Sequence, residues 1–284
     1  MFRTGVFYVR VDAQVVDGKR LVAALDKDDF VVWDEDEPQR IAYFGRESEP
    51  LWVLLLIDVS GSMKHYLDGM AGVARRALAG LGQADHVAVM FFGRETRIAQ
   101  GFTAEKENAA PAIGEAIRER GVGAGTAINP AILDAARYVR ENVANQPGRR
   151  AIVILTDNEG LNYQVTDEMT LAALNAADIV FNAIVTPKSK PPEKRPGYTN
   201  PDFSPADVFK LARETGGEVL RADRAGESFR EMLERIRTRY SLHYRAPEGT
   251  AGQVRRIRVD LRPDTRKRYP RAQVRARSGY AVPN

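Results

Sequence analysis

The segment LWVLLLIDVSGSM, at positions 51–63, joins an uninterrupted apolar run to a turn rich in side-chain oxygens. Positions 51–57 are apolar without alternation, which is typical of a strand covered on both faces, as in a parallel sheet. Asp58, Ser60 and Ser62 follow at every second position. The segment therefore predicts a buried strand that ends in a loop carrying three oxygen ligands.

Three further runs share this unbroken apolar character and predict strands of the same sheet: 87–92, 151–155 and 179–185. Between the strands, apolar residues recur every three or four positions, which predicts helices over 67–81, 128–139 and 166–176. Strands that alternate with helices predict an α/β fold with a doubly wound, mostly parallel, Rossmann-like sheet. Residues 97–102 are expected to add one short antiparallel strand at an edge.

Two more helices are expected later in the chain. Ser204 and Pro205 predict a helix start, with serine as the N-cap and proline in the first turn, and Asp207 at the third helical position. The glycine pair at 216–217 predicts the end of this helix. The second helix has an apolar face of Phe229, Met232, Leu233 and Ile236. Residues 188–201, rich in Lys, Pro and Gly, predict a surface loop.

Both ends of the chain have strand character. Near the N-terminus Val9, Val11, Ala13 and Val15 alternate with polar residues, and near the C-terminus Ile257, Val259 and Leu261 do the same. Chain termini often lie close together. We therefore expect residues 1–49 and 241–284 to build one small β subdomain that flanks an α/β domain at 50–240.

Composition excludes several classes of protein. The 284 residues are 44% hydrophobic and 28% charged, which suits a globular chain with a sizeable core. The absence of cysteine excludes disulfides, thiolate metal sites and a cysteine nucleophile. No apolar run is long enough to span a membrane. The compartment stays open, with an extracytoplasmic location expected if a signal segment was removed before Met1, and so does the oligomeric state.

Two other segments place oxygens at predicted strand ends or loops. Gly123-Ala124-Gly125-Thr126 presents a hydroxyl just before a helix, and Leu155-Thr156-Asp157 ends an apolar strand with a carboxylate. Ligand sites of open α/β sheets lie beyond the carboxyl ends of the strands, so these loops are expected to converge with Asp58. Ligands that are all oxygen suit a hard cation, namely Mg²⁺ or Mn²⁺, and Ca²⁺ also accepts them.

With these residues in view, the chain resembles the von Willebrand factor A domain family over about residues 51–240. Its Asp-x-Ser-x-Ser motif resembles that family's metal-ion-dependent adhesion site. The flanks are similar to a bacterial subgroup, through LDKDDF at 25–30 and RARSGY at 275–280. The resemblance implies one divalent cation, held directly or through water by five residues: Asp58, Ser60, Ser62, Thr126 and Asp157.

The resemblance also implies a function, which is cation-dependent binding of a protein that offers an Asp or Glu to the metal. Two carboxylates and three neutral hydroxyls leave a divalent ion able to attract such a carboxylate. No general base stands near the motif, so we do not expect an enzyme. The alternatives are a metal-dependent hydrolase or phosphatase, which commonly needs a second carboxylate where Ser60 stands, and a structural scaffold that uses no metal.

Two other features of the sequence do not indicate a further binding site. His65, His86 and His243 are scattered without the spacing of metal ligands. The arginine-rich stretch 255–277 alternates with Ile257, Val259 and Leu261, which predicts an outward strand face or a partner surface rather than a nucleic-acid site.

Overall fold

A six-stranded sheet forms the centre of the molecule. In the computed structural model, which describes residues 7–18, 20–46, 49–68, 70–119, 121–160, 164–193, 205–223 and 225–282, its strand order is β11-β10-β9-β6-β7-β8. All neighbours are parallel except β7 and β8, which are antiparallel. The bounds are β6 (Leu51–Asp58), β7 (His86–Phe92), β8 (Thr96–Thr103), β9 (Arg149–Thr156), β10 (Ile179–Val185) and β11 (Val219–Arg221). The predicted α/β fold with a mostly parallel sheet and an antiparallel edge strand is confirmed.

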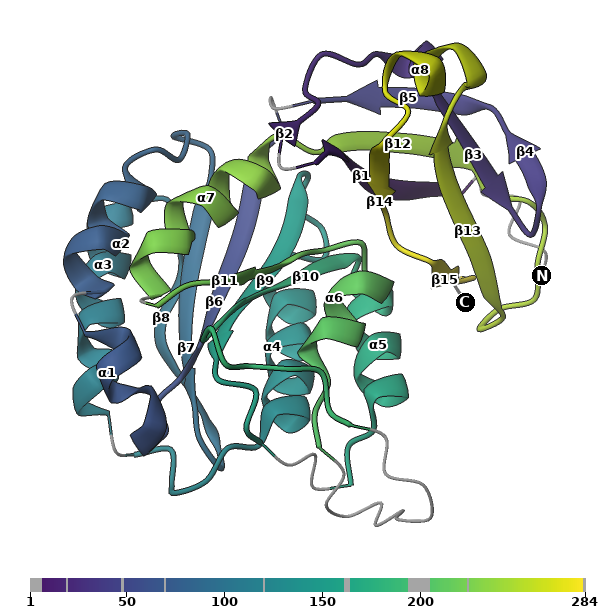
Figure 1. Cartoon of the computed structure of the whole chain (residues 1–284). Coiled ribbons are helices and arrows are strands. Elements are labelled where there is room, and N and C mark those ends of the chain that lie inside the picture. Colours follow the sequence, from purple (N-terminus) through teal and green to yellow (C-terminus); the bar gives the residue numbers. More distant parts are fainter. Residues whose placement is uncertain are drawn as a thin grey trace.

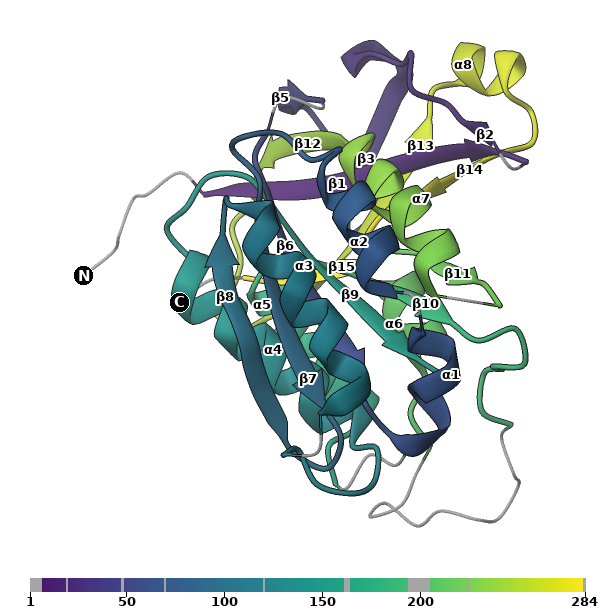
Figure 2. The ribbon, with the colours of Figure 1, turned by 90° about the vertical axis from the view of Figure 1, so that its left-hand side faces the viewer.

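Helices cover both faces of this sheet (Figure 1, Figure 2). Alternate residues of β6 explain why, because Val53 and Leu55 pack with α2, α3 and α7, whereas Leu54 and Leu56 pack with α4 and α6. A strand with two covered faces needs an unbroken apolar run. The helices are α1 (Lys64–Leu67), α2 (Met70–Leu78), α3 (Lys106–Glu115), α4 (Ile128–Val143), α5 (Asp167–Ala176), α6 (Val208–Glu214) and α7 (Ala225–Arg237), with 3₁₀ turns η2 (Gly61–Met63) and η3 (Ala116–Arg118).

Helix boundaries depart from the sequence prediction in three places. The helix predicted over 67–81 is divided into α1 and α2. The start predicted at Ser204 is wrong: α6 begins at Val208, and the Asp207 carboxylate caps it by accepting from Lys210 N. Aspartate caps as well as serine, and here it directly precedes the buried Val208. Ser204 itself and most of the loop predicted at 188–201 lie outside the described residues. Helix α3, interrupted in sequence by Pro111, was not among the predicted helices.

Strands from the two ends of the chain pair with each other. β1 pairs antiparallel with β12 through its first half and with β14 through its second half, and β3 pairs with β13. The two sheets, ordered β14-β1-β12-β5 and β15-β13-β3-β4, share one apolar core. The strands are β1 (Tyr8–Asp17), β2 (Arg20–Leu21), β3 (Phe30–Asp34), β4 (Glu37–Gln39), β5 (Ile41–Gly45), β12 (Tyr240–Arg245), β13 (Val254–Leu261), β14 (Ala272–Arg275) and β15 (Gly279–Ala281), with η1 (Lys27–Asp29) and α8 (Pro263–Arg268).

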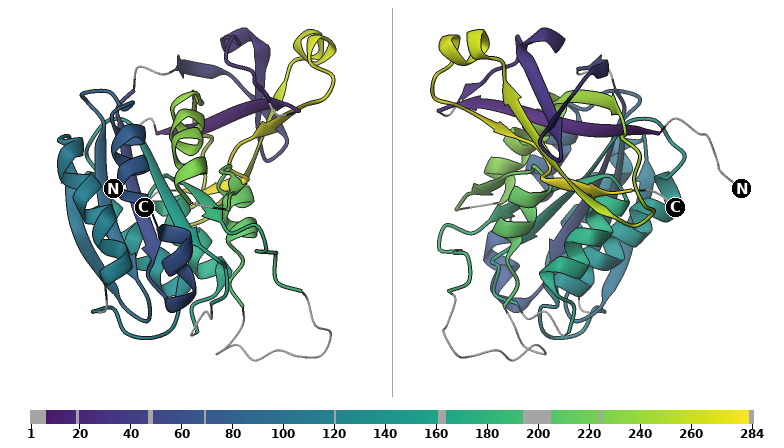
Figure 3. Two further views of the ribbon diagram at one scale, coloured as in Figure 1. Left: turned by 60° about the vertical axis from the view of Figure 1, so that its left-hand side comes forward. Right: turned by 90° about the vertical axis from the view of Figure 1, so that its right-hand side faces the viewer.

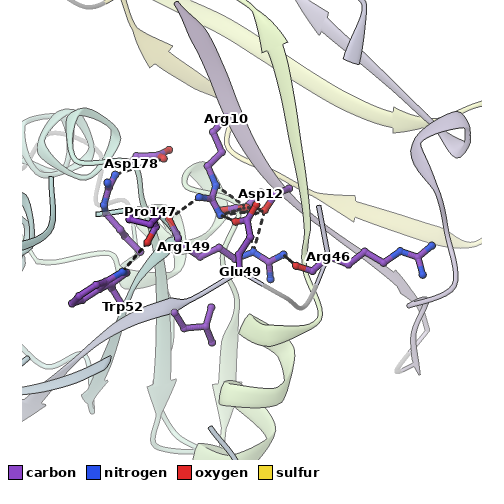
Figure 4. A network of polar contacts seen from close by, with 12 residues as sticks. Arg10, Asp12, Arg46, Glu49, Trp52, Pro147, Arg149 and Asp178 are labelled. Carbon is purple, nitrogen blue, oxygen red and sulfur yellow. Dashed lines mark hydrogen bonds and ion pairs between the residues drawn. The ribbon is translucent and has the colours of Figure 1, made fainter. Parts of the chain in front are cut away.

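A buried polar network lies where these strands meet the α/β sheet (Figure 4). Arg149, at the start of β9, donates to the hydroxyl of Ser241 at 3.1 Å and to the carbonyl oxygens of Arg237 and Arg46 at 2.7 and 2.9 Å. Arg149 thereby bonds to both chain segments that connect the terminal sheets with the α/β part, one before β6 and one at the end of α7. Burial opposes ionisation of Asp12, but the charges of Arg10 and Arg149 outweigh it and lower the pKa of Asp12 to about 2.

Candidate metal centre

The carboxyl ends of β6 and β9 bring Asp58 beside Thr156. Ile57 and Leu155 are paired in the parallel register, so the next residues of the two strands face each other. The Thr156 hydroxyl donates to Oδ2 of Asp58 at 2.8 Å, and the side chain of Asp58 is fully buried. Figure 1 shows the carboxyl end of β6 next to α1, at the end of the sheet that lies away from the terminal strands.

The Asp-x-Ser-x-Ser loop folds back onto its own aspartate. The backbone N–H of Ser60 donates to Oδ1 of Asp58 at 3.0 Å, and the hydroxyls of Ser60 and Ser62 lie 3.2 Å apart. Val59 N donates to Phe92 O at 3.0 Å, which continues the bonding of β6 to β7 beyond the strand end. The loop therefore places both serine hydroxyls at one point, as the spacing predicts.

Two glycines hold the second loop, which carries Thr126. Ala127 N donates to Gly93 O at 2.8 Å, and a Cβ on Gly93 would lie 2.6 Å from Gly123 O. On its other side, a Cβ on Gly160 would lie 2.7 Å from the backbone oxygen of Thr126. Real Cβ atoms do not approach this closely, so only glycine lets the Thr126 loop contact both neighbouring loops.

The third loop contributes Asp157, which directly follows β9. Its side chain is largely buried and accepts from Glu159 N at 2.9 Å, while its backbone oxygen accepts from the Ser189 hydroxyl at 2.7 Å. Burial raises the pKa of Asp58 to about 6 against its hydrogen bonds, and the charge of Asp157 adds to the rise. A buried carboxylate whose ionisation is opposed in this way forms a site that a cation stabilises.

The donor set fits a hard cation. Within the described residues no three His, Cys, Asp or Glu side chains converge, so a site here depends on hydroxyls as well as carboxylates. Carboxylate and hydroxyl oxygens are ligands of Mg²⁺, Mn²⁺ and Ca²⁺ rather than of softer metals. The loops thus bring together the segments that carry all five predicted residues, and the contacts given above join Asp58, Ser60 and Ser62 directly.

A cavity of about 320 Å³ opens beside the Asp-x-Ser-x-Ser loop. It lies between that loop and the glycine-rich second loop, and it is lined by Val59, Ser60, Gly61, Lys64, Glu119, Val122, Gly123, Ala124 and Gly125. Sequence reasoning did not assign a role to Lys64 or Glu119, because neither belongs to the motif. Nor did it assign one to Thr156, although Thr156 precedes Asp157 in the quoted strand end.

Two of the three histidines pack against aromatic side chains. His86 stacks on Trp52 with ring centroids 3.9 Å apart, and His243 meets Tyr43 edge-on at 5.0 Å. Both residues belong to strands, at the start of β7 and within β12, and His65 lies in α1. The structure gives the histidines of β7 and β12 packing roles.

Ion pairs occupy much of the arginine-rich C-terminal stretch. Arg255 pairs with Asp34 at 2.6 Å and Arg256 with Glu35 at 3.1 Å, across to the N-terminal strands. Further pairs join basic residues of this stretch to acids: Arg266 to Asp260, Arg268 to Asp29, Arg275 to Glu218 and Arg277 to Asp178. Much of the positive charge therefore binds the terminal sheets to each other and to the α/β part.

The family of the α/β part follows from the sequence comparison. Residues 53–160 match the model of the von Willebrand factor type A domain family. The matched segment begins inside β6 and ends just after Asp157, so it holds all five predicted ligands. No curated protein matches the chain by sequence.

Solved structures with the same fold include one with a TM-score of 0.52, proximal thread matrix protein 1 from the mussel byssus with a zinc-occupied MIDAS motif. It is 15% identical, and the match covers 73% of this chain and 50% of that one. A von Willebrand factor type A protein from Catenulispora acidiphila is 14% identical over 92% of this chain and 71% of its own, with a TM-score of 0.49. An aerotolerance-related membrane protein from Bacteroides fragilis is 20% identical over 66% and 98%, with a TM-score of 0.48.

Proposed function

We propose that this protein binds one divalent cation and, through it, an acidic side chain of a partner protein. The ligands would be Asp58, Ser60, Ser62 and Thr126, with Asp157 direct or through water. The observation that supports this most strongly is the folding of the Asp-x-Ser-x-Ser loop onto the fully buried Asp58: Ser60 N donates to its carboxylate at 3.0 Å, and the hydroxyls of Ser60 and Ser62 lie 3.2 Å apart. Mg²⁺ is the proposed ion, and Mn²⁺ or Ca²⁺ would accept the same oxygens.

The donor set favours binding over catalysis. Three of the five ligands are neutral hydroxyls, so a bound divalent ion keeps much of its positive charge and attracts an outside carboxylate. The carboxylate of Asp58 is already engaged by Thr156 and Ser60, which leaves it unsuited to act as a general base. We therefore propose a binding module and no enzymatic activity.

A hydrolase or phosphatase and a metal-free scaffold are the competing functions. The first would need a carboxylate where Ser60 stands, and it predicts turnover of a substrate. The second predicts that stability and binding do not respond to metal removal. The fully buried Asp58 opposes the scaffold, because a buried carboxylate lowers stability unless something offsets the cost of burying its charge.

The domain plan and location belong to the same proposal. We propose that residues 50–240 form the binding domain and that segments 1–49 and 241–284 form one unit that supports it from the opposite end of the sheet (Figure 3). An extracytoplasmic location would suit a module that captures proteins. No helix in the described ranges is long and apolar enough to cross a membrane.

Calorimetric titration of Mg²⁺ and Mn²⁺ into metal-stripped protein tests the proposal. We expect saturable binding of one ion in the wild type and its loss in a Ser60→Ala, Ser62→Ala double variant. Thr250→Ala, an exposed hydroxyl in the terminal strands' loop, is the matched control and should bind as the wild type does. Binding that is unchanged in the double variant would contradict the assignment of the ligands.

A further inference from the structure

The cavity beside the candidate metal centre has a definite charge. Two of its nine lining residues are charged, Lys64 and Glu119. Glu119 is engaged, because it pairs with Arg97 and accepts from Gly121 N, and its side chain is only 9% exposed. Lys64, at the start of α1, is exposed, and no ion pair with it occurs among the described residues. The charge offered to a ligand in this cavity is therefore positive.

The walls of the cavity suit a polypeptide segment. Gly61, Gly123, Ala124 and Gly125 present backbone with almost no side chain, and Val59 and Val122 add apolar surface. Backbone N–H and C=O groups exposed in this way can bond to another backbone that passes close to them. A volume of about 320 Å³ equals roughly ten water molecules at ~30 Å³ each, which is room for one or two side chains.

Lys64 lies two residues after Ser62, the last residue of the motif, and it lines the same cavity as Ser60. Because Ser60 is a proposed ligand of the cation and also lines this cavity, a partner whose first carboxylate reaches the cation would have its neighbouring groups at the cavity. A second carboxylate there would meet the ammonium group of Lys64, and a charged donor strengthens such a hydrogen bond. A neutral or basic neighbour would gain nothing from Lys64.

From these observations we propose that the partner segment carries two acidic groups, one for the cation and one for Lys64, and that Lys64 is a specificity-determining residue. This inference rests on the proposed metal-dependent function. It adds the chemistry of the partner, which is an acidic segment rather than a single exposed Asp or Glu.

The test compares two small probes that differ in one group. Glutarate has two carboxylates, and glutaramate, its monoamide, has the same length with one. Affinities are measured calorimetrically with the protein saturated in Mn²⁺, against blank titrations of Mn²⁺ alone. We expect glutarate to bind about fivefold more tightly than glutaramate beyond the twofold statistical advantage of a second carboxylate, which is the size of an exposed charge pair.

Two variants test whether Lys64 causes the preference for glutarate over glutaramate. Lys64→Met removes the charge and keeps the approximate shape of the side chain, and it should reduce the ratio of the two affinities to the statistical value without weakening Mn²⁺ binding. Lys267→Met, an exposed lysine of α8 in the terminal strands, is the matched control and should keep the wild-type ratio. Retention of the preference in Lys64→Met would overturn the role of Lys64.

Other results separate this inference from the proposed function. Mn²⁺ binding with no preference for glutarate would overturn the second acidic contact and leave the metal site intact. Absence of Mn²⁺ binding in the wild type would overturn both.

Discussion

The Thr156 hydroxyl donates a 2.8 Å hydrogen bond to Oδ2 of Asp58, and both groups are fully buried. This bond joins the last residues of β6 and β9, the two strands whose ends and following loops together carry four of the five proposed ligands. It fixes one carboxylate oxygen of Asp58, while Ser60 N fixes the other. Residues that orient metal ligands in this way contribute strongly to metal affinity.

Thr156→Val should therefore weaken Mg²⁺ binding by about 10- to 100-fold, because the carboxylate loses its orienting donor while the side-chain shape is kept. Calorimetric titration of Mg²⁺ measures the change. Thr238→Val provides the control and should leave the affinity unchanged, since this half-buried residue directly follows α7 and its hydroxyl donates to the backbone oxygen of Glu234. Equal affinities in the two variants would show that the Thr156 bond does not position Asp58.

The contribution of Asp58 to the stability of the metal-free protein should fall as the pH rises from about 4 to about 6. The folded pKa of Asp58 is raised to about 6 from 3.8, so in this interval the folded state keeps a proton that the unfolded state has released. Rising pH therefore favours unfolding. The free energy of unfolding decreases by roughly 3 kcal/mol in total before it levels off.

Urea unfolding of wild type and Asp58→Asn across this interval isolates the contribution of Asp58. The difference between the two free energies of unfolding should change with pH and become constant above about pH 6. Saturating Mg²⁺ should oppose the decrease, since the cation favours the ionised carboxylate. A pH-independent difference would contradict the raised pKa.

Gly160→Ala should separate the Thr126 loop from the Asp157 loop. Its new Cβ would lie 2.7 Å from Thr126 O and 2.8 Å from the side chain of Ile128, so the loops must move. We expect a loss of about 1–3 kcal/mol in stability and about tenfold weaker Mg²⁺ binding. Gly72→Ala, in α2 with open space around the new Cβ, is the control and should lose neither.

Arg149→Met should destabilise the whole chain. Arg149 is 2% exposed, and its removal takes a hydrogen-bond donor from the carbonyl oxygens of Arg46 and Arg237 and a neighbouring positive charge from Asp12. Breaking a buried charge network costs about 3–5 kcal/mol, measured by urea unfolding. The exposed pair of Arg137 with Asp134 offers the contrast, because Arg137→Met should cost less than about 1 kcal/mol. Similar costs for both variants would show that the network at the junction is not a major source of stability.

Local pattern was sufficient for much of the fold. The apolar run at 51–57 requires a strand covered on both faces, and the alternation at 257–261 requires one covered face, so β6 and β13 follow from the sequence. Helix starts were harder to predict. The helix predicted over 166–176 begins at Asp167, with Thr166 as its N-cap, but the start predicted at Ser204 was wrong because Asp207 caps α6. Several polar residues can cap a helix, and the packing of Val208 and Leu211 selects among them.

The sequence by itself determined the chemistry of the candidate site, because Asp58, Ser60 and Ser62 stand at alternate positions after a buried strand. The tertiary structure alone decided their surroundings. Thr156 reaches Asp58 only because β6 and β9 are neighbours in the sheet, though 98 residues separate the two. Likewise Arg149 meets Ser241, and Lys64 shares a cavity with Gly123, through contacts between distant segments. Such contacts arise from strand order and loop packing, which no local pattern of side chains encodes.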